Sequence, residues 1–425
     1  MGDTVIKNRD QLICALHEVS ELEQGLMCMY LFAALSMKKA NEPGITPAQA
    51  EQIRRWEANI LMVCRQEMEH LALVNNLLIA IGAEPYFSRP NFPVKYGYYP
   101  IQLPFTLERF NDASLLRFIA FEAPQNWKPG DLGFDAWSLI AQRNLLAGVE
   151  NIKLRQPACL PYNLEFDSVQ QLYDEVTAAI NNVNQFSALD NLFIGNPNQE
   201  PYQDFQFNFE FNIFTFQVTD RATANAAVEL ILKQGEGIDS QPGFSSHFNI
   251  YCEIYKEFIG ANFDPAWNVI ANPSHENVTD EFARAAMDFF NYSYTTMMYM
   301  LASFYKFFSP ASCDSSYRMI STALQNTAFA PMMTMVVRPL GEIITRLPAG
   351  PEGFFAGPNW DIDEEDYSLT PHSEPAFFIE RLHKMKKRAR KLRDAAPSKE
   401  VSERLNYMWE NLSRVELNFK QMTNG

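Results

Sequence analysis

The chain has 425 residues, 47% of them hydrophobic, which is enough for a large buried core and one or two domains. Its 51 acidic residues outnumber 35 basic ones, and the formal net charge of −16 argues against a nucleic-acid partner and against binding to an anionic membrane surface. The six cysteines show no paired spacing and the N-terminus has no apolar signal region, so we expect a reduced, cytoplasmic protein. The most apolar run, 289–308, contains several polar residues, which predicts a core helix rather than a membrane span.

The first predicted helix runs from about Asp10 to Lys39. Its residues at heptad spacing form an apolar seam that one carboxylate, Glu23, interrupts near the middle. The seam consists of Leu12, Leu16, Val19, Glu23, Leu26, Tyr30, Ala33 and Met37. A short turn sequence follows, and Thr46 with Pro47 then begins the next helix as an N-cap followed by proline. Because the connection is short, the two long helices should be antiparallel neighbours.

The second helix carries the most informative seam, between Ile53 and Ile81. Seven of its nine members are large and apolar, and the other two are Glu67 and His70 at the centre. The seam consists of Ile53, Trp56, Ile60, Val63, Glu67, His70, Val74, Leu77 and Ile81. Positions i and i+3 share a helix face, so both polar side chains point into one buried space, where an unpaired carboxylate is costly. A metal ion would offset that cost, and an inward Glu-x-x-His is the half-site of carboxylate-bridged di-iron bundles; a hydrogen-bonded core histidine is the alternative.

The middle of the chain mixes short predicted helices with irregular segments. We expect helices at 113–122, ended by Pro124, at 134–148 and at 169–183. Residues 205–213 alternate Phe or Ile with polar residues, and this period of two predicts a β-strand.

A broken helical pattern follows the predicted strand. It runs over 221–233, breaks around Glu236, and resumes near Ser245 with His247 on its apolar face. On an unbroken helix, Glu236 and His247 would lie about 16 Å apart along the axis, too far to share one metal site. The glycines and the proline between them allow the chain to loop out and return, which would bring both side chains to one centre. The alternative is an ordinary helix–loop–helix with Glu236 on the surface.

The C-terminal part of the chain is also predicted to be helical. Long helices are expected at 279–308 and 317–346, and Pro331 and Pro339 should bend or break the second of them. The last helix, 400–422, follows a basic run, HKMKKRARKLRD, which we interpret as a solvated helix face.

The polar residues of the apolar faces together suggest one metal centre. The predicted ligands are Glu23, Glu67, His70, Glu236 and His247, with Glu175 as the first candidate for a sixth, Gln171 equally near the same apolar face, and Glu229 as a further alternative. Oxygen and nitrogen ligands with open positions suit iron or manganese, and reduced iron passes electrons to O₂, so we expect O₂ as co-substrate. Tyr30, one heptad from Glu23, is either a core tyrosine or a donor or substrate contact at this centre.

Four separated blocks of the sequence carry a family resemblance. They are LHEVSELEQGLMCMYLFAAL, QEMEHLALVNNLLIAIGAEP, ILKQGEGIDSQPGFSSHFNIY and VVRPLGEIITRLPAGPEGFFAGPNW. In this order they resemble the ferritin-like domain of iminophenyl-pyruvate dimer synthases, enzymes of pigment and indole-alkaloid biosynthesis that couple imines of oxidised aromatic amino acids. The resemblance implies an iron- or O₂-dependent oxidative role for the five predicted ligands. The family usually has Glu at the position of Gln171, so this departure leaves the sixth ligand open. The dimer synthases are also far longer, so this chain matches only one of their domains and we do not assign imine dimerisation to it.

These observations predict a mostly α protein, a ferritin-like four-helix bundle with additional C-terminal helices and a small β element. Residues 1–265 should form the metal-binding bundle with inserted loops, and 266–425 a helical extension packed on it. The predicted function is di-iron, O₂-dependent oxidation of a small amino-acid-derived substrate in specialised metabolism. The alternatives are a ferroxidase and a non-catalytic scaffold of a biosynthetic complex. The expected partners are a small-molecule substrate, with further copies of the chain or a biosynthetic partner enzyme.

Overall fold

In the computed structural model the chain forms two compact units. The first holds the described residues of Met1–Pro197 and Ile213–Ala266, and the second holds those of Trp267–Gly425. The structure describes residues 5–94, 99, 103–124, 166, 168–182, 192–196, 215–235, 245–307, 315–362 and 373–423.

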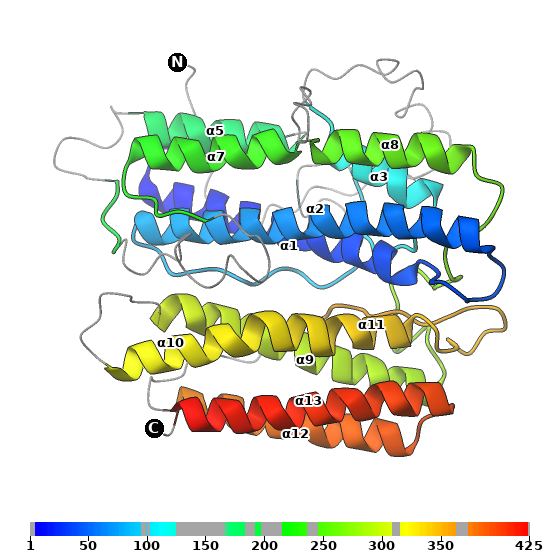
Figure 1. Cartoon of the computed structure of the whole chain (residues 1–425). Coiled ribbons are helices and arrows are strands. Elements are labelled where there is room, and N and C mark those ends of the chain that lie inside the picture. The colour runs from blue at the N-terminus through cyan, green and yellow to red at the C-terminus, as the bar shows by residue number, and fades with distance from the viewer. Residues whose placement is uncertain are drawn as a thin grey trace. The chain divides into compact units, whose positions relative to one another are not determined.

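Two long neighbouring helices, α1 (Arg9–Ser36) and α2 (Pro47–Ala80), form the base of the first unit (Figure 1). The side chain of Asn8 caps α1 by accepting a hydrogen bond from the backbone N–H of Gln11, and Thr46 with Gln49 forms a capping box at the start of α2. Every member of the two predicted seams is buried. Each large apolar side chain buried in this way contributes roughly 1.5–3 kcal/mol to folding, so the seams determine how the two helices face each other.

The second layer of this unit consists, in its described part, of short helices rather than two further long ones. They are α3 (Asp112–Phe121), α5 (Val169–Asn181), α7 (Arg221–Gly235) and α8 (His247–Ile259). Helix α5 packs against α7 and α3 packs against α8, and the two pairs follow one another along the long helices (Figure 1). Side chains at the ends of the short helices therefore come to lie beside the middle of the long ones.

The second unit is helical as well. It consists of α9 (Glu281–Phe307), α10 (Ser315–Thr327), η2 (Ala328–Val337), α11 (Arg338–Ile344), α12 (Glu374–Asp394) and α13 (Lys399–Thr423). The single helix expected at 317–346 is divided into three parts. Residues of η2 form a π-helix around Pro331, since proline lacks an N–H and its ring collides with the preceding turn, and Pro339 lies in the first turn of α11.

The prediction of a mostly α bundle is confirmed. The described residues contain no strand, only isolated β-bridges such as Met37 with Ala266. The strand expected at 205–213 and the helix expected at 134–148 lie outside the described residues. A membrane-crossing helix is absent from the described part of the chain, where none is both long and apolar enough.

Candidate metal centre

The carboxylate of Glu67 lies between two histidines at the middle of α2. Its Oε2 atom is 3.2 Å from Nδ1 of His70, and its Oε1 atom is 3.0 Å from Nδ1 of His247. The two imidazole rings are stacked at an interplanar angle of 26°, with their centroids 5.4 Å apart. One carboxylate thus faces two separate histidine nitrogens, which is the arrangement expected of a bridging carboxylate in a two-ion site.

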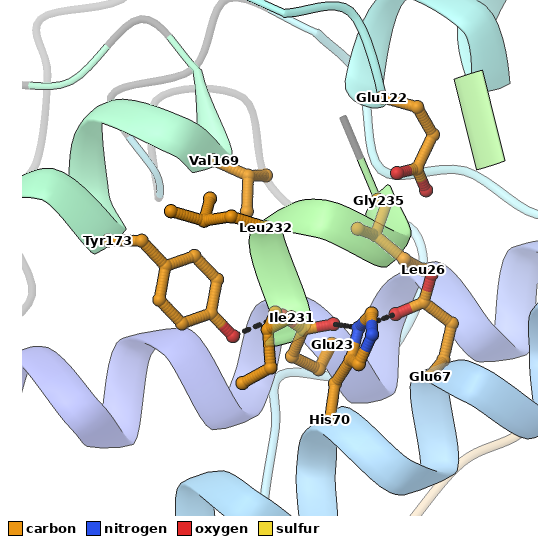
Figure 2. A pocket seen from close by; sticks show the side chains of 10 residues that line it. All are labelled: Glu23, Leu26, Glu67, His70, Glu122, Val169, Tyr173, Ile231, Leu232 and Gly235. Atoms are coloured by element: carbon orange, nitrogen blue, oxygen red, sulfur yellow. Dashed lines mark hydrogen bonds and ion pairs between the residues drawn. The ribbon is translucent and has the colours of Figure 1, made fainter. Parts of the chain in front are cut away.

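The first half-site is formed by Glu23 of α1 with His70 (Figure 2). Oε2 of Glu23 lies 3.3 Å from Nδ1 of His70, and the hydroxyl of Tyr173 on α5 donates a hydrogen bond to the other oxygen, Oε1. Both Glu23 and His70 are 2% exposed. The phenol therefore fixes the carboxylate while leaving its second oxygen directed at the histidine.

The second half-site is formed by Glu122 and His247, which come from the ends of two short helices. Glu122 is the C-cap of α3, a helix that cannot continue because Pro124 follows, and His247 is the first residue of α8. Oε2 of Glu122 is 3.5 Å from Nδ1 of His247, and the hydroxyl of Tyr30 donates to Oε1 of Glu122. This half-site repeats the pattern of the first one: a histidine, a carboxylate and a phenol that holds the carboxylate.

The five side chains form two groups that share Glu67. Within each group the candidate ligand atoms all lie within 4.8 Å of one another. The groups are Glu23, Glu67 and His70, and Glu67, Glu122 and His247. Each group offers oxygen and nitrogen atoms from buried side chains, a donor set suited to a first-row transition metal.

Burial and mutual charge shift the pKa values of these groups strongly. Burial, with the charge of Glu67 adding to it, raises the pKa of Glu23 to about 8. Burial alone would lower the pKa of His247, but the carboxylates of Glu122 and Glu67 outweigh it and raise this pKa to about 9. The pKa of His70 is raised well above its usual value for the same reason, with Glu23 and Glu67 outweighing burial. Burial would raise the pKa of Glu67, yet the two histidines hold it well below its usual range. Protons on three of the groups thus balance the buried negative charge.

The structure brings together four of the predicted ligands: Glu23, Glu67, His70 and His247. The fifth, Glu236, lies outside the described residues. The residue that the sequence reasoning missed is Glu122, because its position at the end of a short helix has no periodic signal; the proline two residues later was the only indication of a helix end there.

The helix around 169–181 contributes a phenol rather than a carboxylate to the described centre. Glu175 belongs to neither group, and its Oε2 atom accepts a hydrogen bond from the backbone N–H of Val5 at 3.2 Å. Gln171 and Glu229 are likewise in neither group, and Glu229 is exposed. Tyr173, one turn along the same face as Val169, reaches Glu23 instead.

A small cavity is lined by residues of both half-sites. Its volume is about 20 Å³, which is room for a water molecule or a metal ion and too little for an organic molecule. The polar side is formed by ligands of both half-sites, and the apolar side by Leu26, Val169, Ile231 and Leu232 (Figure 2). Val169 and Leu232 are half-buried, whereas Leu26 and Ile231 are buried.

A family model described as ferritin-like matches residues 16–256, more than half of the 425-residue chain. The chain belongs to the ferritin-like family. All five residues of the candidate metal centre fall within the matched range, and the resemblance predicted from the sequence blocks is confirmed.

Two curated proteins are similar to this ferritin-like chain. Dichlorochromopyrrolate synthase of Lentzea aerocolonigenes is 26% identical over 409 residues, covering 85% of this chain and 37% of that protein. The 2-imino-3-(indol-3-yl)propanoate dimerase of Chromobacterium violaceum is 25% identical over 386 residues, covering 84% of this chain and 34% of the dimerase. The chain therefore spans about a third of the length of the curated relatives it matches, both of which have enzyme names.

Among solved structures, a ferritin-like protein from Caulobacter vibrioides matches with 14% identity and a TM-score of 0.43. The match covers 74% of this chain and 92% of that one.

Proposed function

We propose that this chain binds two iron ions at the two half-sites and uses O₂ to oxidise a small, amino-acid-derived molecule in specialised metabolism. The observation that carries the proposal is the carboxylate of Glu67, whose two oxygens face two histidines that each have a carboxylate of their own.

The residues fit two divalent ions by charge as well as by donor type. The buried carboxylates of Glu23 and Glu122 each have an oxygen within 4.8 Å of an oxygen of Glu67. The raised pKa values of Glu23 and His247 mean that protons balance part of this negative charge. Metal ions would replace those protons, because carboxylate and neutral imidazole are the metal-binding forms. Iron, when bound, would supply electrons to O₂; manganese suits the same ligands and is the alternative metal.

The surrounding residues would position these ligands and keep water out. Tyr173 and Tyr30 each hold one oxygen of a carboxylate, so that the other oxygen remains directed at the centre. The buried side chains of Leu26 and Ile231 shield the part of the cavity that they line from solvent. A dry, low-dielectric centre strengthens electrostatic interactions and limits side reactions of oxidised species with water.

The size of the cavity limits how a substrate can meet the centre. A volume of about 20 Å³ admits O₂-sized molecules, so only the reacting group of an organic substrate would approach the ions, from the half-buried side formed by Val169 and Leu232. The choice of an amino-acid-derived substrate rests on the dimerase relative, whose name specifies an indolyl imino acid. Since the chain spans about a third of that relative, coupling of two such molecules is not part of the proposal.

Metal content tests the proposal first. The full chain, reconstituted with Fe(II) without oxygen and freed of loosely bound metal, should retain two irons by plasma mass spectrometry. Oxygen consumption should then rise on addition of an aromatic amino acid or of the imino acid made from it by an amino-acid oxidase. A protein that retains no iron after reconstitution would refute the proposal and favour a scaffold role.

A ferroxidase is the second candidate, and the small cavity favours it. A space that holds ions but no organic molecule suits Fe(II) as the substrate. The two functions differ in the reductant that sustains oxygen consumption. A ferroxidase consumes O₂ continuously with excess Fe(II) alone, whereas the proposed oxidase stops after its bound iron is oxidised unless an organic substrate is present.

A further inference from the structure

The far side of His70 is held by a buried glutamine. The Nε2 atom of the His70 ring, which points away from the carboxylates, lies 2.8 Å from Oε1 of Gln234 on α7. Gln234 is 5% exposed and directly precedes Gly235, the last residue of that helix. A primary amide offers oxygen on one side and NH₂ on the other, so its orientation decides whether the imidazole nitrogen must donate or accept.

A buried carboxylate sets that orientation. Nε2 of Gln234 donates a hydrogen bond to Oε1 of Glu69 at 2.9 Å, and Glu69 is only 2% exposed. A carboxylate accepts hydrogen bonds, so the NH₂ of the amide must face Glu69 and the amide oxygen must face the imidazole. The amide oxygen can only accept, and Nε2 of His70 therefore carries a proton.

We propose that the hydrogen-bonded pair Glu69–Gln234 is a positioning device, which keeps a proton on Nε2 of His70 and reserves Nδ1 of that ring for metal. The inference rests on the proposed function for the metal itself. It explains why Glu69, which lies outside the apolar seam of α2, is buried beside the centre. Neither residue belongs to the two groups of candidate ligands, so the pair would act on a bound metal through His70.

The other histidine has a weaker support of the same kind. Nε2 of His247 lies 3.1 Å from Oε1 of Gln66, a half-buried residue on α2. In the described part of the chain, no second hydrogen bond orients the amide of Gln66 as Glu69 orients that of Gln234. The Gln66 amide is therefore free to turn either its oxygen or its NH₂ toward His247. We expect the half-site of Glu23 and His70 to bind its ion more tightly than the half-site of Glu122 and His247.

An exchange of the two supporting residues tests the device. In Glu69→Gln the new amide can donate or accept, so Gln234 is free to turn and offer its NH₂ to the imidazole. The double variant Glu69→Gln/Gln234→Glu restores a fixed polarity, since the new carboxylate at 234 accepts from both the amide at 69 and Nε2 of His70. The double variant thus keeps the proton on Nε2 of His70, although the carboxylate and the amide have exchanged positions.

The probe is Zn(II), titrated into the full chain with a competing chelator, and the second readout is the ¹H–¹⁵N correlation spectrum of ¹⁵N-histidine-labelled protein. Loss of an orienting partner of a metal-bound histidine typically lowers affinity by about 10–100-fold. We expect a decrease of this size in the tighter binding step for Glu69→Gln, and recovery to within a few-fold of wild type in the double variant. Gln66→Ala, the control, should weaken only the second step.

The spectra decide between positioning and a general loss of structure. In the Zn(II)-loaded wild type, His70 should have metal on Nδ1 and a slowly exchanging proton on Nε2. Unchanged affinity in Glu69→Gln, failure of the double variant to recover, or metal on Nε2 of His70 would each overturn the inference. If the wild type binds no Zn(II), the proposed function fails. The inference is then decided in the metal-free protein, where the proton on Nε2 of His70 should exchange slowly in the wild type and rapidly in Glu69→Gln.

Discussion

Metal binding should release protons from this protein, because three of the candidate ligands hold protons that an ion must displace. A pH of 7 is below the raised pKa values of Glu23, His70 and His247, so these three groups are predominantly protonated. Glu67, whose pKa is lowered, is already ionised. Filling both half-sites at this pH should therefore release about three protons per chain.

The cost of that release follows from the pKa values. Removing the proton of His247, with a pKa of about 9, costs about 3 kcal/mol at pH 7, and removing that of Glu23, with a pKa of about 8, costs about 1 kcal/mol. Affinity therefore rises with pH. The overall affinity for the two ions should increase by about a thousandfold per pH unit, which is one factor of ten for each proton released. This increase per pH unit should become smaller as the pH passes about 8, where Glu23 ionises, and again near 9, where His247 does.

Isothermal titration calorimetry measures the number of protons released on metal binding. Zn(II) is titrated into the full chain at pH 7 in two buffers of different protonation enthalpy, and the difference in observed heat gives the protons released. Glu175→Gln is a matched control, since that carboxylate lies outside both groups and should leave the number unchanged. Two ions bound with release of fewer than one proton would refute the reasoning, because the histidines and Glu23 would then have been unprotonated beforehand.

Four substitutions and one control test the centre and the fold. Glu67→Ala should abolish binding of both ions and Glu122→Ala of one, whereas Glu175→Ala should retain two by plasma mass spectrometry; two ions in the Glu67 variant would exclude a bridging role. Gly235→Val should selectively lower the affinity for the ion at the half-site of Glu122 in a chelator competition. A Cβ at position 235 would lie 3.3 Å from Oε2 of Glu122, and a larger side chain would displace that carboxylate. An unchanged second step would show that the carboxylate moves freely. Trp56→Ala should lower the free energy of unfolding by about 3–5 kcal/mol in a denaturant titration, since this side chain is 1% exposed in the α2 seam. A loss below about 1 kcal/mol would contradict its place in the core.

The sequence by itself was sufficient for the long helices and for the candidate ligands that lie together on them. Glu23, Glu67 and His70 interrupt apolar seams of 3.6-residue periodicity, and all three are buried at one level. This works because side chains three, four and seven residues apart share a helix face whatever the rest of the chain does. His247 was predicted for a related reason, as a polar residue on an otherwise apolar helix face.

Only the tertiary structure decided which residues complete the centre. Glu122 and His247 meet because α3 and α8 pack against each other, and Tyr173, rather than Glu175, faces Glu23 because of how α5 packs along α1. Gln234 reaches His70 and Glu69 across a sequence separation of about 165 residues. No local pattern encodes such meetings. They depend on where short helices end and on how connections of tens of residues return the chain, and those are properties of packing rather than of periodicity.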